Sequence, residues 1–245
     1  VSVTGTTRID AATITTTGNQ TYTGAVTLGN TATLASTSSG NIAFTGAVTA
    51  AAASTYGLTV NTAGSTSFGG TVGATSLSSV TTDAAGTLSI TGGSINTSGA
   101  QTFNDPLTLG AGTTTFTANN GTTNQLVTFA NTVAGTAGGS NIDVNNANAR
   151  FDDAVSGNIG TIVVDGTAAI NTATVTSSGN QTWTGTVTLG ADTTFTADNA
   201  GTAMLVDFAN TTQAVTGAMS NRILTVSDNA RFRGPVSSLL ASVSV

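Results

Sequence analysis

Residues 18–28 read GNQTYTGAVTL, and the same phrase returns as GAQTFNDPLTL at residues 99–109 and as GNQTWTGTVTL at residues 179–189. Chance does not produce three such matches at nearly equal spacing, so the chain contains an internal repeat of about 81 residues. We place the three repeats at approximately residues 1–81, 82–161 and 162–242. No charged or proline-rich linker separates them, and the sequence therefore predicts a single continuous domain.

A shorter motif recurs inside each repeat: an aromatic residue, three mostly small or turn-forming residues, and then usually valine. Its spacing averages about 27 residues, and the two wider steps, from residue 68 to 103 and from 151 to 183, leave room for an additional turn. From these steps we expect nine to twelve coils. We predict that the aromatic residues of the motif form the structural ladder of the core: Tyr22, Phe44, Phe68, Phe103, Phe129, Phe151, Trp183, Phe208 and Phe232.

The local pattern is that of short β-strands. In Thr21, Tyr22 and Thr23 the aromatic side chain points one way and the threonines the other, because side chains alternate along a strand. Two architectures fit: a parallel β-solenoid, in which outward threonines form ladders, and a string of three β-sandwich domains of the immunoglobulin type. A sandwich has no reason to repeat one phrase three times inside itself. The sequence therefore favours the solenoid, an all-β parallel β-helix.

The composition excludes several function classes. The chain has no His and no Cys, all its basic residues are arginines and all its acids are aspartates, and charged residues make up only 7% of it. Without cysteine there is neither a disulfide scaffold nor a thiolate metal site. The net charge of −6 argues against nucleic acid as a partner, because phosphate binding needs clustered Lys and Arg. No apolar run is long enough for a membrane-spanning helix.

Acidic residues provide few candidate sites. Arg150 lies beside the acidic pair formed by Asp152 and Asp153, which we interpret as surface charges at a coil corner rather than as part of a catalytic site. We therefore predict no enzyme activity. Aspartates at turns supply the oxygen ligands that calcium needs, although the nonapeptide of calcium-binding β-rolls is absent. Calcium is thus the one cofactor with candidate ligands, and turn formation alone also explains them: Asp192, Asp198 and Asp228.

The two ends of the chain carry the same short sequence. Residues 243–245 read VSV, as do residues 1–3, and the distance between them corresponds to three repeats. The chain thus ends in the register in which it begins. We expect it to be part of a longer array, or to associate with itself end to end.

Repeats such as residues 18–29, poor in Lys and Cys, resemble those of large bacterial surface proteins of the filamentous-haemagglutinin and autotransporter type. The resemblance extends over the whole chain, but it concerns composition and the character of the repeats rather than a diagnostic motif. No functional residue can be transferred from it. It implies a right-handed parallel β-helix that is exported to the cell surface or the extracellular space.

Two functions are consistent with these features. The first is a structural element of an extracellular filament, sheath or stalk that extends by stacking of its repeats. The second is a cell-surface adhesin or biofilm-matrix protein whose binding surface lies in longer coils at the two wide steps. Because few aromatic residues remain outside the core motif, the sequence favours the structural role.

Overall fold

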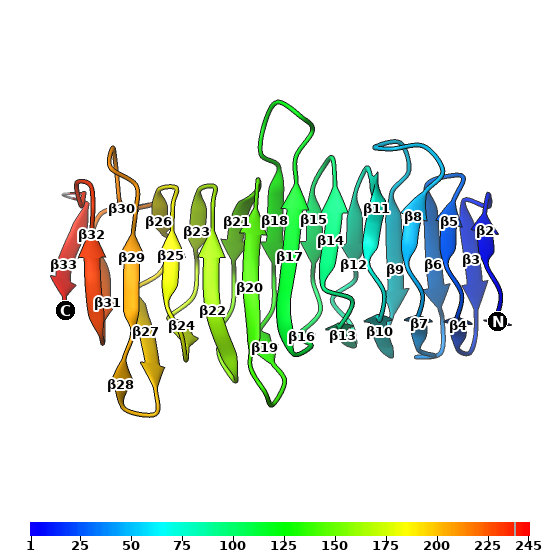
Figure 1. Cartoon of the computed structure of the whole chain (residues 1–245), viewed down its shortest axis with the longest axis horizontal. Coiled ribbons are helices and arrows are strands. Elements are labelled where there is room, and N and C mark those ends of the chain that lie inside the picture. Colours follow the sequence, from blue (N-terminus) through cyan, green and yellow to red (C-terminus); the bar gives the residue numbers. More distant parts are fainter. Residues whose placement is uncertain (238) are drawn as a thin grey trace.

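The computed structural model describes residues 1–237 and 239–245 as one elongated stack of β-strands (Figure 1). The chain winds through three strands in each coil, and each strand pairs in parallel with the equivalent strand of the next coil. The described residues contain no helix, and so none that could cross a membrane. The predicted β-solenoid is confirmed with about 11 coils. The β-sandwich alternative is wrong, because the long sheets are parallel.

The three sides of the solenoid are here called faces A, B and C. Face A contains a seven-stranded sheet and then the strands of a second sheet, and Val155 joins the two by parallel bridges to Val133 and Val175. Its strands are β1 (Ser2–Val3), β4 (Gln20–Tyr22), β7 (Ile42–Phe44), β10 (Ser65–Phe68), β13 (Thr87–Ile90), β16 (Leu107–Leu109), β19 (Val133–Gly135), β24 (Thr174–Ser177), β27 (Thr193–Asn199), β31 (Arg222–Val226) and β33 (Leu240–Ser244).

Face B is one eleven-stranded sheet. It consists of β2 (Thr7–Ile9), β5 (Val26–Leu28), β8 (Val48–Ala50), β11 (Val72–Leu77), β14 (Ser94–Thr97), β17 (Gly112–Ala118), β20 (Ser140–Asn145), β22 (Ile159–Val164), β25 (Gln181–Trp183), β29 (Leu205–Phe208) and β32 (Asn229–Phe232).

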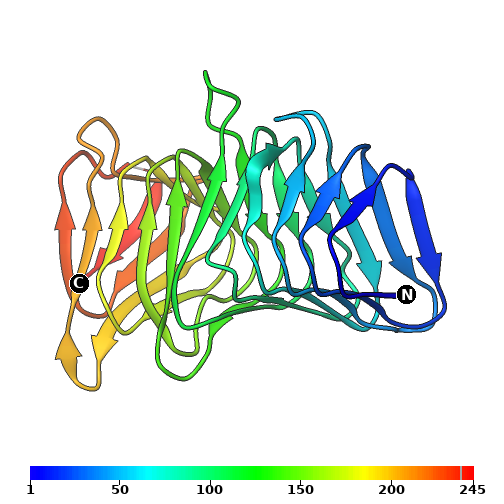
Figure 2. The same cartoon turned by 45° about the vertical axis from the view of Figure 1, so that its right-hand side comes forward.

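Face C is one ten-stranded sheet, which Val236 extends by a bridge to Val215. It consists of β3 (Thr13–Thr16), β6 (Ala32–Ser36), β9 (Leu58–Thr62), β12 (Val80–Thr82), β15 (Gln101–Phe103), β18 (Leu126–Phe129), β21 (Asn148–Phe151), β23 (Ala168–Ile170), β26 (Val187–Leu189) and β30 (Val215–Gly217). The remaining strand, β28 (Thr202–Ala203), pairs antiparallel with the end of β27 and forms a projecting hairpin (Figures 1 and 2).

The sequence repeat does not contain a whole number of coils. Tyr22 of the first repeat lies on face A, Phe103 of the second on face C, and Trp183 of the third on face B. Eleven strand positions separate β4 from β15, and eleven separate β15 from β25 when the bridge at Val155 is included. Each repeat therefore spans three and two-thirds coils, and three repeats complete eleven coils.

This fractional repeat divides the predicted aromatic ladder into three stacks, one on each face. Ring centroids lie 5.3 Å apart between Tyr22 and Phe44 on face A, 4.9 Å between Phe129 and Phe151 on face C, and 5.0 Å between Phe208 and Phe232 on face B. Eight of the nine side chains are buried; Phe232, in the last strand of face B, is only partly buried. The nine residues are thus core residues, but they do not form one continuous ladder.

The two wide steps between aromatic residues follow from the same geometry. From Phe68 on face A to Phe103 on face C, and from Phe151 on face C to Trp183 on face B, the chain covers one and two-thirds coils. These segments contain ordinary coils rather than enlarged ones. The expectation of longer coils at these two steps is therefore wrong.

A buried glutamine occupies the equivalent position in each repeat, as the first residue of β4, of β15 and of β25. Gln20, Gln101 and Gln181 are fully buried, and each donates from Nε2 to a backbone carbonyl of the next coil at 2.8, 2.8 and 2.9 Å. Each Nε2 also contacts a hydroxyl and a carbonyl of the preceding strand. These contacts satisfy the Nε2 group of each amide, and Oε1 of Gln20 accepts from the Tyr22 hydroxyl at 3.1 Å, whereas Oε1 of Gln101 and of Gln181 has no partner among the described residues. The donor contacts shared by the three repeats account for the recurrence of glutamine in the phrase Gln-Thr-aromatic.

Outward-facing side chains form regular rows, as expected from the threonine pattern. On face C, six successive rungs each place one threonine directly over the last: Thr13, Thr33, Thr59, Thr81, Thr102 and Thr128. The corresponding row on face A contains only small residues, which are Ser2, Thr21, Ala43, Ser67, Ser89, Thr108 and Ala134. These two rows are therefore uncharged over the first seven rungs of face A and the first six of face C.

Candidate functional site

A shallow polar groove of about 240 Å³ lies at the corner where face A passes into face B. Its lining comes from several coils: Gly139 before β20, residues 157–159 at the start of β22, residues 176–178 at the end of β24, and Asp198 in β27. The β19–β20 loop and the β27–β28 hairpin both project from the solenoid on this side (Figure 1). The groove therefore lies beside the two projecting loops of this corner.

Some of the polar groups that line the groove are committed to the fold. The Ser177 hydroxyl donates to the Gly179 carbonyl at 2.7 Å, and the Ser178 hydroxyl donates to the Ile159 carbonyl at 3.2 Å. Asp198 accepts the Gly201 amide through Oδ1 at 2.8 Å, which closes the hairpin turn. The two serine hydroxyls and Oδ1 of Asp198 therefore stabilise the walls of the groove and are already occupied by hydrogen bonds within the protein.

Other groups remain available. Within the described residues, the side-chain amide of Asn158, the hydroxyl of Thr176 and Oδ2 of Asp198 make no hydrogen bond. Asn158 has a positive φ of 60°, a conformation that asparagine tolerates better than most residues. Together these groups provide donors, acceptors and one negative charge. Chemically, this arrangement can donate hydrogen bonds to and accept them from a small hydroxylated group.

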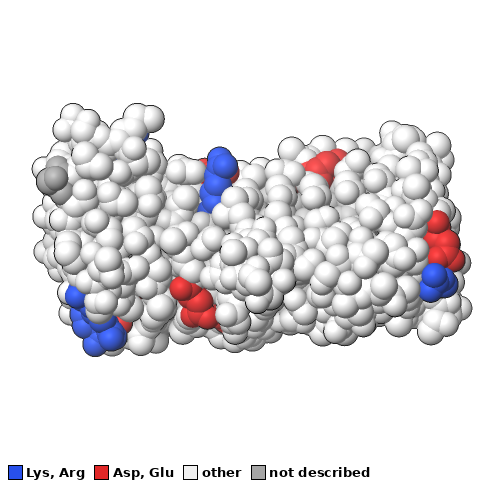
Figure 3. Space-filling model, turned by 90° about the horizontal axis from the view of Figure 1, so that it is seen from above, with Lys and Arg blue, Asp and Glu red and all other residues white. Residues whose placement is uncertain are grey.

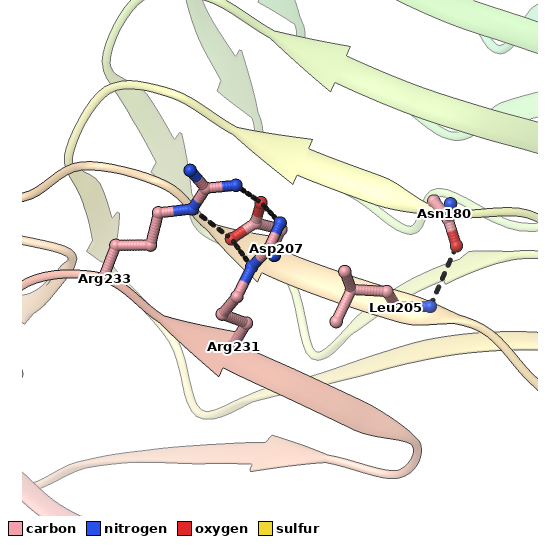
Figure 4. A network of polar contacts seen from close by, with 5 residues as sticks. All are labelled: Asn180, Leu205, Asp207, Arg231 and Arg233. Atoms are coloured by element: carbon pink, nitrogen blue, oxygen red, sulfur yellow. Dashed lines mark hydrogen bonds and ion pairs between the residues drawn. The ribbon is translucent and has the colours of Figure 1, made fainter.

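A second cluster of charges lies on face B near the C-terminal end of the stack (Figure 4). Asp207 in β29 is 5% exposed and accepts from both guanidinium groups that cover it: Arg231 Nε at 3.0 Å and Arg233 Nη2 at 2.7 Å. Arg231 contributes a second, shorter bond from Nη2, and Arg233 one from Nε at 3.2 Å. These donors lower the pKa of Asp207 from 3.8 to about 2 despite its burial.

The repeat explains how this cluster arose. Asp207 stands where the second repeat has Thr128, and Arg233 stands where it has Asp152. In the second repeat, Arg150 instead pairs with Asp152 at 2.7 Å. The two differences compensate one another, because the extra arginine acquires a carboxylate on the neighbouring rung. Sequence reasoning missed this cluster, although the paired differences between repeats were a visible signal.

The adjacent acidic residues Asp152 and Asp153, predicted to lie at a coil corner, have different hydrogen-bond partners. Asp152 accepts from Arg150 and, through the same Oδ1, from the side-chain amide of Asn171 at 2.7 Å. Asp153 instead accepts the backbone amide of Ala154 at 2.7 Å. The two carboxylates therefore take part in separate surface contacts.

The three calcium candidates do not converge on one site. Asp192 precedes β27 and accepts the Ile223 amide at 3.1 Å, whereas Asp198 lies near the other end of the same strand. Asp228 accepts the Ala197 amide at 2.8 Å. Each carboxylate accepts one backbone amide, and the described residues include no group of three His, Cys, Asp or Glu side chains that could hold a metal ion.

No protein-family model matches the chain, and comparisons with curated proteins and with solved structures find no similar protein.

Proposed function

We propose that the chain is a structural segment of an extracellular filament, sheath or stalk, of the kind found on bacterial surfaces, and that it extends by stacking of solenoid repeats. One observation carries this proposal: three repeats complete eleven coils, so that residues 1–3 and 243–245, which read the same, both reach face A. A further block of three repeats would therefore continue all three sheets in phase. Parallel rungs also leave backbone groups at the ends of the stack that favour continued pairing.

The lateral surface supports a passive structural role. Charged residues are few and scattered in the view of the rod from above (Figure 3). Rows of Ser, Thr and Ala run along seven rungs of face A, and a row of Thr runs along six rungs of face C. The large aromatic residues are buried, with the exceptions of Tyr56 and Phe232, which are partly buried. Among the described residues, the exposed large apolar side chains lie mostly near the two ends of the chain rather than along the sides of the rod: Val1, Leu126, Met219, Ile223, Leu239, Val243 and Val245. The sides of the rod therefore lack the extended apolar patch that marks a strong binding site.

The test is a tandem fusion in which residues 1–245 follow directly after residues 1–242. Eleven rungs of about 4.8 Å give roughly 53 Å per block, so we expect a straight rod of about 105 Å by electron microscopy and small-angle scattering. The control fusion has a flexible Gly-Ser linker of about 20 residues at the junction and should give two rods at variable angles. If the direct fusion bends as freely as the linked one, the repeats do not extend the stack and the proposal is wrong.

The groove favours a second candidate function, an adhesin that binds a surface glycan. Its free amide, hydroxyl and carboxylate groups match the hydroxyls of a sugar, and its volume suits one residue of a polysaccharide. The test is a glycan array with the intact chain, followed by Asn158→Ala and by Asn199→Ala, which lies outside the groove lining. Binding that is lost only in Asn158→Ala would support this function; no binding, or equal binding by both variants, would exclude it.

A further inference from the structure

One carboxyl group in the solenoid is buried without a partner. Asp105 lies in the corner between β15 and β16, where its residue is 1% exposed. Neither of its carboxylate oxygens has a hydrogen-bond partner among the described residues. A buried polar group without a partner is costly, and a buried charge without one is more so. This position therefore requires an explanation that packing alone does not provide.

The other repeats show why an aspartate fits only here. The equivalent residues are Gly24 and Gly185, where an added Cβ would lie 2.4 Å from the Gly5 carbonyl oxygen and 2.2 Å from the Gly166 carbonyl oxygen. The corners beneath those glycines contain three residues, at 4–6 and 165–167. Beneath Asp105 the corner contains four, at 83–86. The longer corner leaves room for a side chain that the other two repeats exclude.

The surroundings of Asp105 disfavour its charge. On the coil beneath, Asp83 is a second negative group, held by a hydrogen bond from the Thr62 amide to Oδ1 at 3.0 Å. On the coil above, residues 130–132 contain no ionisable side chain, and neither do the flanking residues Asn104 and Pro106. The buried hydroxyl of Thr82 lies near enough to favour the charge and opposes the rise in the pKa of Asp105, although the two groups do not meet the geometry of a hydrogen bond. None of the arginines in the described part of the chain acts on this carboxyl group.

We propose that the corner formed by residues 83–86 and 104–106 is a proton-controlled joint of the solenoid, closed when Asp105 is protonated and loosened when it is ionised. Burial, reinforced by the charge of Asp83, raises the pKa of Asp105 from 3.8 to about 6. The folded corner therefore binds the proton about a hundredfold more tightly than the unfolded chain does. At acidic pH the corner is neutral and packed, whereas above about pH 6 the ionised carboxylate must remain unsolvated or open the corner to water.

Hydrogen exchange on the full chain tests this proposal between pH 4.5 and pH 8, after correction for intrinsic exchange. Amides of residues 103–109 should lose protection by up to about a hundredfold as pH rises, while those of β26, four coils away, should not. Asp105→Asn should remove this dependence, and so should Asp105→Gly, which restores the residue of the other two repeats. Asp83→Asn should move the transition to lower pH, and Asp153→Asn, at an exposed corner, should leave it unchanged.

Two results would overturn the joint. One is the same pH dependence in Asp105→Asn and Asp105→Gly as in the parent chain. The other is a carbon-13 NMR titration of the Asp105 carboxyl group with a midpoint below about pH 4.5, since that midpoint would mean that burial does not hold the proton. A midpoint near pH 6 together with pH-independent exchange in both variants would support it.

Discussion

Replacing Asp207 with threonine should destabilise the protein by about 2 kcal/mol at neutral pH. The arginines lower the pKa of Asp207 from 3.8 to about 2, and one pKa unit corresponds to about 1.36 kcal/mol, which gives about 2.4 kcal/mol. Because about half of each arginine side chain is exposed, solvent screening reduces this figure. The variant also leaves Arg231 and Arg233 facing each other without the carboxylate between them.

The second repeat supplies the rescue. Adding Arg233→Asp to Asp207→Thr recreates the arrangement of Thr128, Arg150 and Asp152, and should restore at least half of the lost stability. Urea unfolding followed by circular dichroism gives the free energies, at about 0.05 M and about 0.5 M salt, since salt should shrink the difference between parent and single variant. A single variant within about 0.5 kcal/mol of the parent, or a double variant less stable than the single one, would refute the reasoning.

Three further outcomes are expected. Stability against urea should peak near pH 4: the lowered pKa of Asp207 adds stability that is lost as pH falls from about 4 to 2, whereas the raised pKa of Asp105 removes stability as pH rises from about 4 to 6. Gly185→Ala should lower the thermal midpoint markedly, because its Cβ would collide with the Gly166 carbonyl oxygen, whereas Gly18→Ala, whose Cβ meets nothing within 4 Å, should be tolerated. Phe129→Ala should cost about 3–5 kcal/mol in urea unfolding, because its ring packs between neighbouring rings at 4.9 and 5.8 Å.

The fold was largely predictable because its determinants are periodic. The phrase around Gln20 and Tyr22 marks the long repeat, and the alternation of Thr and aromatic residues marks short strands with one buried side. The number of coils in each repeat was not predictable in the same way. This number depends on strands that place an aliphatic residue where others have an aromatic one, such as Ile90 in β13 and Ile170 in β23. It also depends on Val155, which takes the place of a strand on face A through two isolated bridges.

The candidate sites were harder to predict, because they combine residues from different coils. The groove brings Asn158, Thr176 and Asp198 together through stacking, and no motif in the sequence connects them. Asp105 did carry a signal, since aspartate replaces glycine at one of three equivalent positions. Its burial depends on one additional residue in the corner beneath, and that relation becomes visible only when the coils are aligned in space.

The fractional repeat also constrains how such a rod can lengthen through duplication. Inserting a single repeat keeps every sheet intact but rotates everything beyond the insertion by two-thirds of a turn about the axis of the rod. Loops and grooves beyond the insertion then lie on a different side of the rod from those before it. Inserting three repeats brings each decoration back to its original side, eleven coils further along. Selection on length alone would accept either event, whereas selection on what one side presents to its surroundings would retain only triplets.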